Sequence, residues 1–144
     1  MMTITFTKRL WCCILLLFSG LLFYGCKDDP NPQEERLKEL TATWETTRVT
    51  NDAVDVTAQF SDFELTLSSE RTFSTVNGGN PWPASGTFSF IDETNLDVIR
   101  RSDGVEVRIV EISATTLSLS FSINSVRSGI DGITGNFTFS LSKQ

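Results

Sequence analysis

The sequence predicts an all-β domain, an antiparallel up-and-down barrel of about eight strands preceded by one short helix. Two observations predict this class. Apolar residues alternate with polar ones over much of the chain after residue 42, and turn residues separate the alternating runs at short intervals. Strands joined by short connections are antiparallel, and strands with one apolar face each lose their free edges by closing into a barrel. A β-sandwich is the alternative.

The chain begins with the features of a bacterial secretion signal. Lys8 and Arg9 precede an apolar run over residues 11–24, which is shorter than the roughly 20 residues of a membrane span. The run ends in Phe-Tyr-Gly-Cys26, which resembles the lipobox of bacterial lipoproteins. The resemblance implies that residues 1–25 are a signal peptide and that Cys26 is acylated and becomes the mature N-terminus. An ordinary secretory signal is the alternative.

The residues after Cys26 are predicted to form a lipidated tether over residues 26–32. Lys27, Asp28 and Asp29 resemble the export signal that sends lipoproteins of Bacteroidetes-type bacteria to the outer face of the outer membrane. We therefore expect a lipid-anchored protein of the outer membrane, exposed at the cell surface. A periplasm-facing location is the alternative, in which these residues serve only as a polar tether.

The charge of the mature chain argues against nucleic acid as a partner. All 18 acidic residues follow Cys26, whereas Lys8 and Arg9 of the signal are two of only 12 basic residues. Phosphate binding requires a basic face, which this composition does not provide. Residues 33–144 are long enough for one barrel domain with its own core.

Residues 31–41 are predicted to form the helix. Asn31 can cap it, Pro32 suits the first helical position, and Glu34 and Glu35 lie in the first turn, where the helix dipole favours negative charge. Leu37 and Leu40 lie three residues apart, so the helix can pack this narrow apolar stripe against an end of the barrel.

From residue 43 onward the apolar period is two. The sequence predicts strands over residues 43–50, 63–69, 72–76, 86–91, 96–100, 105–112, 116–123 and 136–142, with a short irregular strand over 54–59. Asp103-Gly104 is a strong hairpin signal. The apolar phase changes near Ile109, which predicts either a bulge there or a strand buried on both faces.

Several of these stretches resemble the lipocalin-like domain of Bacteroidetes lipoproteins. They are Trp44 after the short helix, the Phe-Glu-Leu-Thr-Leu run from Phe63, the Gly-Thr-Phe-Ser-Phe run from Gly86, and the paired strands 107–112 and 116–121. The resemblance covers most of residues 36–142. It implies a small β-barrel and binding of a small ligand.

The residue types exclude most enzyme chemistry. The chain contains no histidine, and acylation would block Cys26, the one cysteine of the mature part. A Cys/His nucleophile, a Ser/His/Asp triad or a histidine-ligated metal therefore cannot be built. Catalysis by carboxylates alone is the remaining enzymatic alternative, but the acidic residues are expected to lie mostly on polar strand faces. We therefore expect no catalytic residues, no metal and no cofactor.

Two features are candidate binding elements. The first is Trp82, held between two prolines on a glycine-containing loop over residues 77–83, where it either contacts a ligand or plugs an end of the barrel. The second is the set of inward phenylalanines, which line a small cavity or fill it. The candidate ligand-binding phenylalanines are Phe63, Phe73, Phe88, Phe90, Phe121 and Phe139.

The sequence as a whole therefore predicts a cell-envelope lipoprotein that is a non-enzymatic binding module for a small or apolar ligand. The alternative is a structural or interaction domain, without a ligand cavity, that presents loops to a protein or glycan partner. The membrane is a partner in both cases, through the N-terminal lipid anchor.

Overall fold

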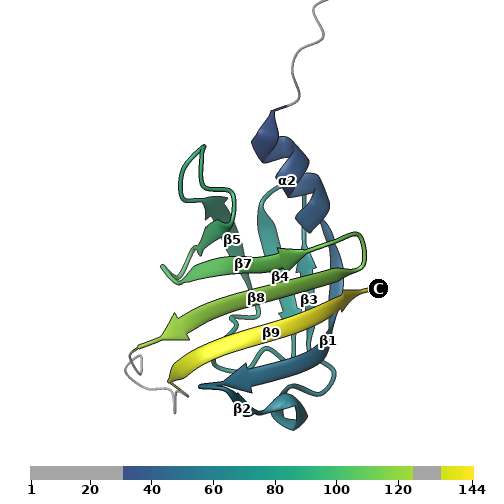
Figure 1. Ribbon diagram of the computed structural model, residues 1–144, viewed down its shortest axis with the longest axis vertical. Coiled ribbons are helices and arrows are strands. Elements are labelled where there is room, and N and C mark those ends of the chain that lie inside the picture. Colours follow the sequence, from purple (N-terminus) through teal and green to yellow (C-terminus); the bar gives the residue numbers. More distant parts are fainter. Residues whose placement is uncertain (1–30, 125–133) are drawn as a thin grey trace, which may run out of the picture. The chain divides into compact units, whose positions relative to one another are not determined.

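In the part of the chain that the structure describes, eight antiparallel strands form a closed up-and-down barrel, and helix α2 (Pro32–Leu40) precedes the first of them (Figure 1). The computed structural model describes residues 31–124 and 134–144. Strand β1 (Ala42–Asn51) pairs with β3 (Glu64–Leu67) on one side and with β9 (Gly135–Lys143) on the other. This second pairing closes the barrel, so the fold class predicted from the alternation is confirmed.

The strands follow one another around the barrel in sequence order from β3 to β9, each hydrogen-bonded to the next. The two-residue strand β2 pairs only with the end of β1. The remaining elements are α2 (Pro32–Leu40), β2 (Val54–Asp55), β4 (Thr72–Val76), β5 (Ser85–Phe90), β6 (Val98–Arg101), β7 (Glu106–Ile112) and β8 (Thr116–Ile123).

Helix α2 begins and ends as its sequence predicts. The Asn31 side chain accepts a hydrogen bond from the Gln33 backbone N–H at 3.0 Å, which satisfies one of the free donors of the first turn. At the other end, the Trp44 indole Nε1 donates to the Leu40 carbonyl at 2.9 Å. Leu37 and Leu40 are buried in the core. The helix thus covers one end of the barrel (Figure 1).

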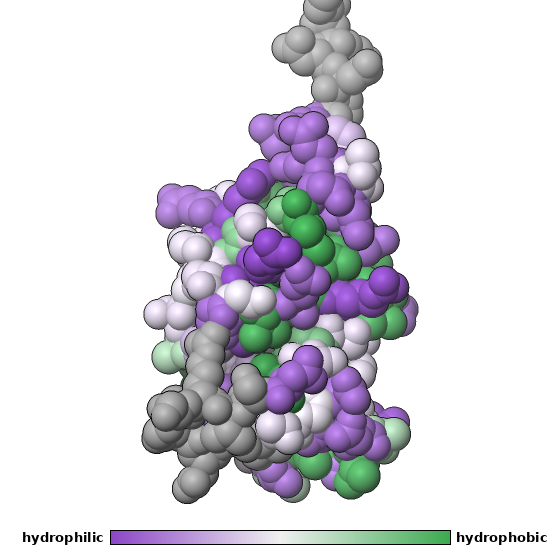
Figure 2. Space-filling view, turned by 90° about the vertical axis from the view of Figure 1, so that its left-hand side faces the viewer, coloured by the Kyte–Doolittle hydropathy of each residue, from purple (hydrophilic) through white to green (hydrophobic). Residues whose placement is uncertain are grey.

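The predicted alternation is clearest in β8 and β9. Leu117, Leu119 and Phe121 of β8 are buried, as are Phe137 and Phe139 of β9. The serines and threonines between them face outward and are half-buried or exposed. Figure 2 shows one side of the molecule, where hydrophobic residues are interspersed with hydrophilic ones.

Three local predictions are refined by the structure. A register shift between Ile109 and Glu111 gives β7 the predicted bulge, and Val110 is 58% exposed, so β7 is not buried on both faces. The irregular strand over 54–59 is instead β2 followed by a 3-10 turn (Thr57–Phe60). The strand predicted over 96–100 begins two residues later and continues to Arg101. The other strand bounds differ by at most two residues.

Candidate functional site

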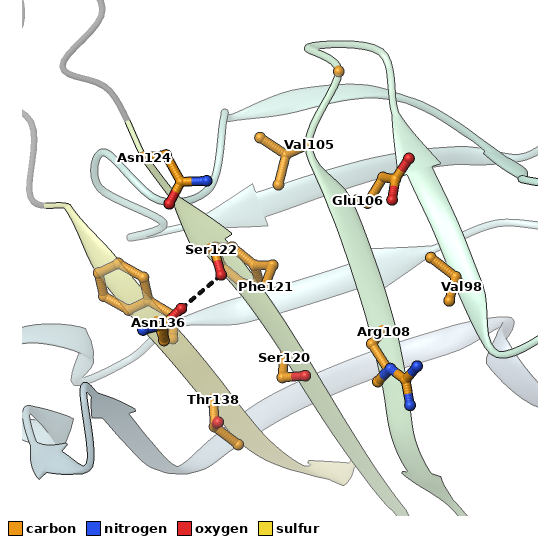
Figure 3. A pocket seen from close by; sticks show the side chains of 12 residues that line it. Val98, Val105, Glu106, Arg108, Ser120, Phe121, Ser122, Asn124, Asn136 and Thr138 are labelled. Atoms are coloured by element: carbon orange, nitrogen blue, oxygen red, sulfur yellow. Dashed lines mark hydrogen bonds between the residues drawn. The ribbon is translucent and has the colours of Figure 1, made fainter.

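A groove lies on the outer face of the barrel where β7 and β8 separate, and its volume is about 610 Å³ (Figure 3). This volume is within the range of small-ligand sites. The groove is lined by Val98, Gly104, Val105, Glu106, Arg108, Ser120, Phe121, Ser122, Asn124, Asn136, Phe137 and Thr138. It is mostly polar in its side chains and open to solvent.

The polar rim on β8 and β9 is held in place by hydrogen bonds. The Ser122 hydroxyl donates to Asn136 Oδ1 at 2.7 Å, and Asn136 Nδ2 donates to Asp52 Oδ1 at 2.6 Å. The Asn136 backbone N–H donates to the same Asp52 oxygen at 3.1 Å. Because Asp52 belongs to the turn between β1 and β2, these bonds connect the groove to the β1–β2 hairpin. The Asn136 side chain is therefore fixed in one orientation.

The β7 side of the groove carries its charges. Glu106 accepts a hydrogen bond from Arg100 at 2.6 Å, and both side chains are about half exposed. Arg108 is also exposed, and it makes no ion pair with any residue that the structure describes. A ligand at this site would meet one unpaired guanidinium and several hydroxyl and amide groups.

The inner side of the groove is apolar. Phe121 and Phe137 are buried, and their rings stack with centroids 5.7 Å apart. Val98 and Val105 are half-buried on the β6–β7 side. The arrangement combines a few polar groups of fixed position with apolar surface, which is the combination found in small-molecule sites.

The structure places the sequence-predicted ligand residues mainly inside the barrel. Trp82 is 1% exposed, and its ring lies 5.4 Å from Phe121 and 5.8 Å from Phe73, measured between centroids. Phe63 and Phe139 also contact it, at 6.2 Å each. The described interior is thus packed ring against ring around Trp82, and the loop that carries Trp82 inserts it as a plug. Of the candidate residues, Phe121 alone also lines the groove.

Phe88 and Phe90 complete the inward set, at 4% and 8% exposure. The structure adds Phe60, which comes from the 3-10 turn and packs 5.1 Å from Phe139. Alternation could not predict this inward position, because Phe60 does not lie on a strand. Phe137, on the strand predicted over residues 136–142, is also buried.

The interior also contains a charged pair that the sequence did not reveal. Arg101 is 2% exposed, and its Nε and Nη2 atoms donate to the two Asp103 carboxylate oxygens at 3.1 and 2.6 Å. Its Nη1 donates to the Pro81 carbonyl at 2.8 Å, and the guanidinium carbon lies 4.6 Å from the Trp82 ring centroid. Burial of this charge is tolerated because both the pairing and the hydrogen bonding are provided. Arg101 thereby holds the Trp82 loop against the barrel.

The predicted signal peptide, Cys26 and the Lys27-Asp28-Asp29 motif all lie outside the described residues, as does most of the glycine-containing stretch 129–135. In the ranges 31–124 and 134–144, no helix is long and apolar enough to cross a membrane. The same ranges contain no group of three or more His, Cys, Asp or Glu side chains placed to hold a metal ion.

The described residues define the class of this protein as a small all-β barrel preceded by helix α2. Searches against protein-family models, curated proteins and solved structures found no match to the chain.

Proposed function

We propose that this chain is a lipid-anchored lipoprotein of the cell envelope whose barrel is a non-enzymatic binding module for a small ligand. The groove between β7 and β8 is the binding site in this proposal. The observation that carries it is the contrast between the described interior, where aromatic rings pack around Trp82, and an open outer groove of about 610 Å³. The side chains that line the groove include hydrogen-bonding groups and the half-buried Val98 and Val105.

The chemistry of the groove suits an amphipathic ligand of modest size. Arg108 can pair with an anionic group, while the hydroxyls of Ser120 and Thr138 can hydrogen-bond to it. The apolar part of the ligand would contact Val98 and Val105, which line the groove and are half-buried. The lipocalin-like resemblance supports the small-ligand function, although this proposal has the ligand outside the barrel rather than within it.

A dye titration tests this proposal. The probe is an anilinonaphthalene sulfonate, which joins an aromatic system to one negative charge, and the protein is the domain prepared without its signal segment. We expect saturable uptake at one site per chain. Ser120→Trp should abolish this uptake, because the new side chain occupies the groove. Ser118→Trp is the matched control: Ser118 lies two residues away on the same face of β8 and does not line the groove.

The outcomes distinguish the candidate functions. Uptake that survives Ser120→Trp would locate the ligand elsewhere and contradict the groove. The absence of uptake in the unmodified protein would favour the alternative, an interaction domain that presents loops to a protein or glycan partner. The observation in favour of that alternative is the burial of Trp82, because its ring contacts other inward aromatic rings such as Phe73 and is not available to a ligand at the surface.

The cellular location is a second part of the proposal. The lipobox-like segment before Cys26 supports lipid anchoring, and Lys27-Asp28-Asp29 supports exposure at the cell surface. Changing Asp28 and Asp29 to alanine should reduce cleavage by protease added to intact cells, without changing the total membrane-bound amount. Unchanged cleavage would favour the periplasm-facing location.

A further inference from the structure

The barrel wall is open along one part of the contact between β7 and β8. Their pairing extends only to Arg108 opposite Ser120. Beyond this point lie the N-terminal end of β7 and the C-terminal end of β8. There Glu106 of β7 pairs with Arg100 of β6, and β8 continues to pair with β9 as far as Ile123. Each strand is therefore held by its other neighbour, while the two strands diverge from each other (Figure 3).

The backbone groups along this opening follow from the alternation of antiparallel hydrogen bonds. The Val105 carbonyl accepts a hydrogen bond from the Arg101 backbone N–H of β6 at 2.9 Å. Backbone groups of successive residues point to opposite sides of a strand, so the next residue, Glu106, directs its N–H and C=O toward β8. The Thr115 carbonyl accepts a hydrogen bond from the Lys143 backbone N–H of β9 at 2.8 Å. Seven residues later, Ser122 therefore directs its backbone groups toward β7. Over this stretch the described residues provide no β7–β8 pairing for them.

Unpaired strand edges of this kind accept an added strand. An extended peptide laid along β8 would find the Ser122 backbone N–H and C=O at its side. The edge is short, because β7 and β8 meet again at Arg108 and Ser120. Only the end of a peptide, and not the middle of a continuing chain, fits against this closed end.

The closed end also contains Arg108, which makes no ion pair with any residue that the structure describes. Arg108 is opposite Ser120, and Ser120 is opposite Thr138, so one guanidinium and two hydroxyls form a row across three strands. Glu106, the nearest acidic residue lining the groove, is already paired with Arg100. A carboxylate can accept charge-assisted hydrogen bonds from such a row.

We propose that the opening between β7 and β8 binds the C-terminal end of an extended peptide, which adds to the edge of β8 as an antiparallel strand. Because β8 runs toward the open end of the groove, an antiparallel peptide runs toward Arg108. Its C-terminal carboxylate then reaches the guanidinium. This inference names a ligand class for the groove and rests on the proposed function of that groove.

Peptide pools test the inference. The probes are three fluorescently labelled pools of random pentapeptides: one with free C-terminal carboxylates, one C-terminally amidated, and one with free carboxylates but N-methylated backbones. Fluorescence anisotropy is measured with the full-length protein purified in detergent micelles. We expect saturable binding of the first pool alone, since the second lacks the charge for Arg108 and the third lacks the N–H groups of a strand.

Substitutions then locate the site. Arg108→Gln should weaken binding of the carboxylate pool by about 10- to 100-fold, the usual value of a hydrogen bond to a charged group. Arg48→Gln is the control, because Arg48 is an exposed arginine on the outer face of β1 that does not line the groove. It should leave binding unchanged.

Two kinds of result would overturn the inference. Equal binding of the amidated or N-methylated pool would show that charge recognition or strand addition is absent. Failure of every pool with a protein that still takes up the sulfonate dye in the groove would exclude peptides while leaving the proposed function intact. Failure of both the peptides and the dye would overturn both proposals.

Discussion

Ser120 and Phe121 are neighbours on β8 with opposite surroundings. Phe121 points inward to Trp82, Phe137 and Phe139, whereas Ser120 points outward into the groove. This alternation is the basis of both the core and the candidate site, because each strand supplies apolar residues to one and polar residues to the other.

Truncation of the inward rings should therefore be costly. We expect Phe121→Ala and Phe139→Ala each to lower the free energy of unfolding by about 3 to 5 kcal/mol, the usual loss for a buried phenylalanine. Ser120→Ala and Thr138→Ala should change it by no more than about 0.5 kcal/mol. Denaturant unfolding of the four variants measures the difference. Equal losses in all four would mean that both faces of these strands are buried.

Asp55 is an exposed acidic residue whose pKa is lowered in the folded protein. Hydrogen bonds from the Thr57 hydroxyl and backbone N–H, at 2.7 and 3.0 Å, hold the pKa of Asp55 below its ordinary value, with a further contribution from Arg48 at 3.2 Å. A lowered pKa in the folded state means that the ionised form stabilises the fold above the ordinary pKa of about 3.9. This stabilisation is lost as the pH falls through the lowered value.

Asp55→Ala should accordingly destabilise the domain at pH 7 and have a progressively smaller effect below about pH 4. Denaturant unfolding of the two proteins at pH 7 and at pH 2.5 measures the change. A difference in stability that does not vary with pH would show that the carboxylate charge is not involved.

Among the secondary-structure elements, helix α2 packs against the barrel and shares its core. Leu40 is fully buried, and its carbonyl accepts the Trp44 indole hydrogen bond. Arg36 donates to the Leu96 carbonyl and pairs with Asp97, which connects the helix to the segment before β6. The helix is thus attached both by its apolar stripe and by polar contacts.

Leu40→Ala should lower the free energy of unfolding by about 2 to 5 kcal/mol. Lys38→Ala, on the exposed side of the same helix, is the control and should remain within about 0.5 kcal/mol of the unmodified protein. Denaturant melts measure both. A loss for Leu40→Ala as small as that for Lys38→Ala would indicate that the helix is not packed on the barrel in solution.

The strands show how far the sequence predicts this fold and its site. Period-two alternation located all eight barrel strands, and the change of phase near Ile109 predicted the bulge of β7. It did not predict the opening beyond Arg108, because alternation specifies which face a side chain occupies and not whether neighbouring strands remain paired. The burial of Arg101 was not predicted either, because an arginine beside a hairpin turn is usually exposed and its partner Pro81, 20 residues away in the sequence, meets it only in the folded barrel.

For the whole molecule, the proposed location in the cell envelope depends on the lipid anchor at Cys26. Acylation of Cys26 would supply about 0.8 kcal/mol of membrane affinity for each buried methylene. Cys26→Ser should move the protein to the soluble fraction or leave it with its signal uncleaved. Fractionation of cells followed by mass measurement of the N-terminus tests this. Membrane association and processing identical to those of the unmodified protein would contradict the anchor.

The central claim is that ligand binds in the groove and not within the aromatic interior. The indole N–H of Trp82 is a direct reporter of the interior, because Trp82 lies among the inward rings and is 1% exposed. The backbone amides of Ser122 and Asn136 report on the groove. The decisive measurement is a titration of the sulfonate dye into ¹⁵N-labelled domain, followed by two-dimensional NMR. We expect the Ser122 and Asn136 signals to shift while the Trp82 indole signal stays in place. A shift of the Trp82 indole with no change at Ser122 and Asn136 would contradict it.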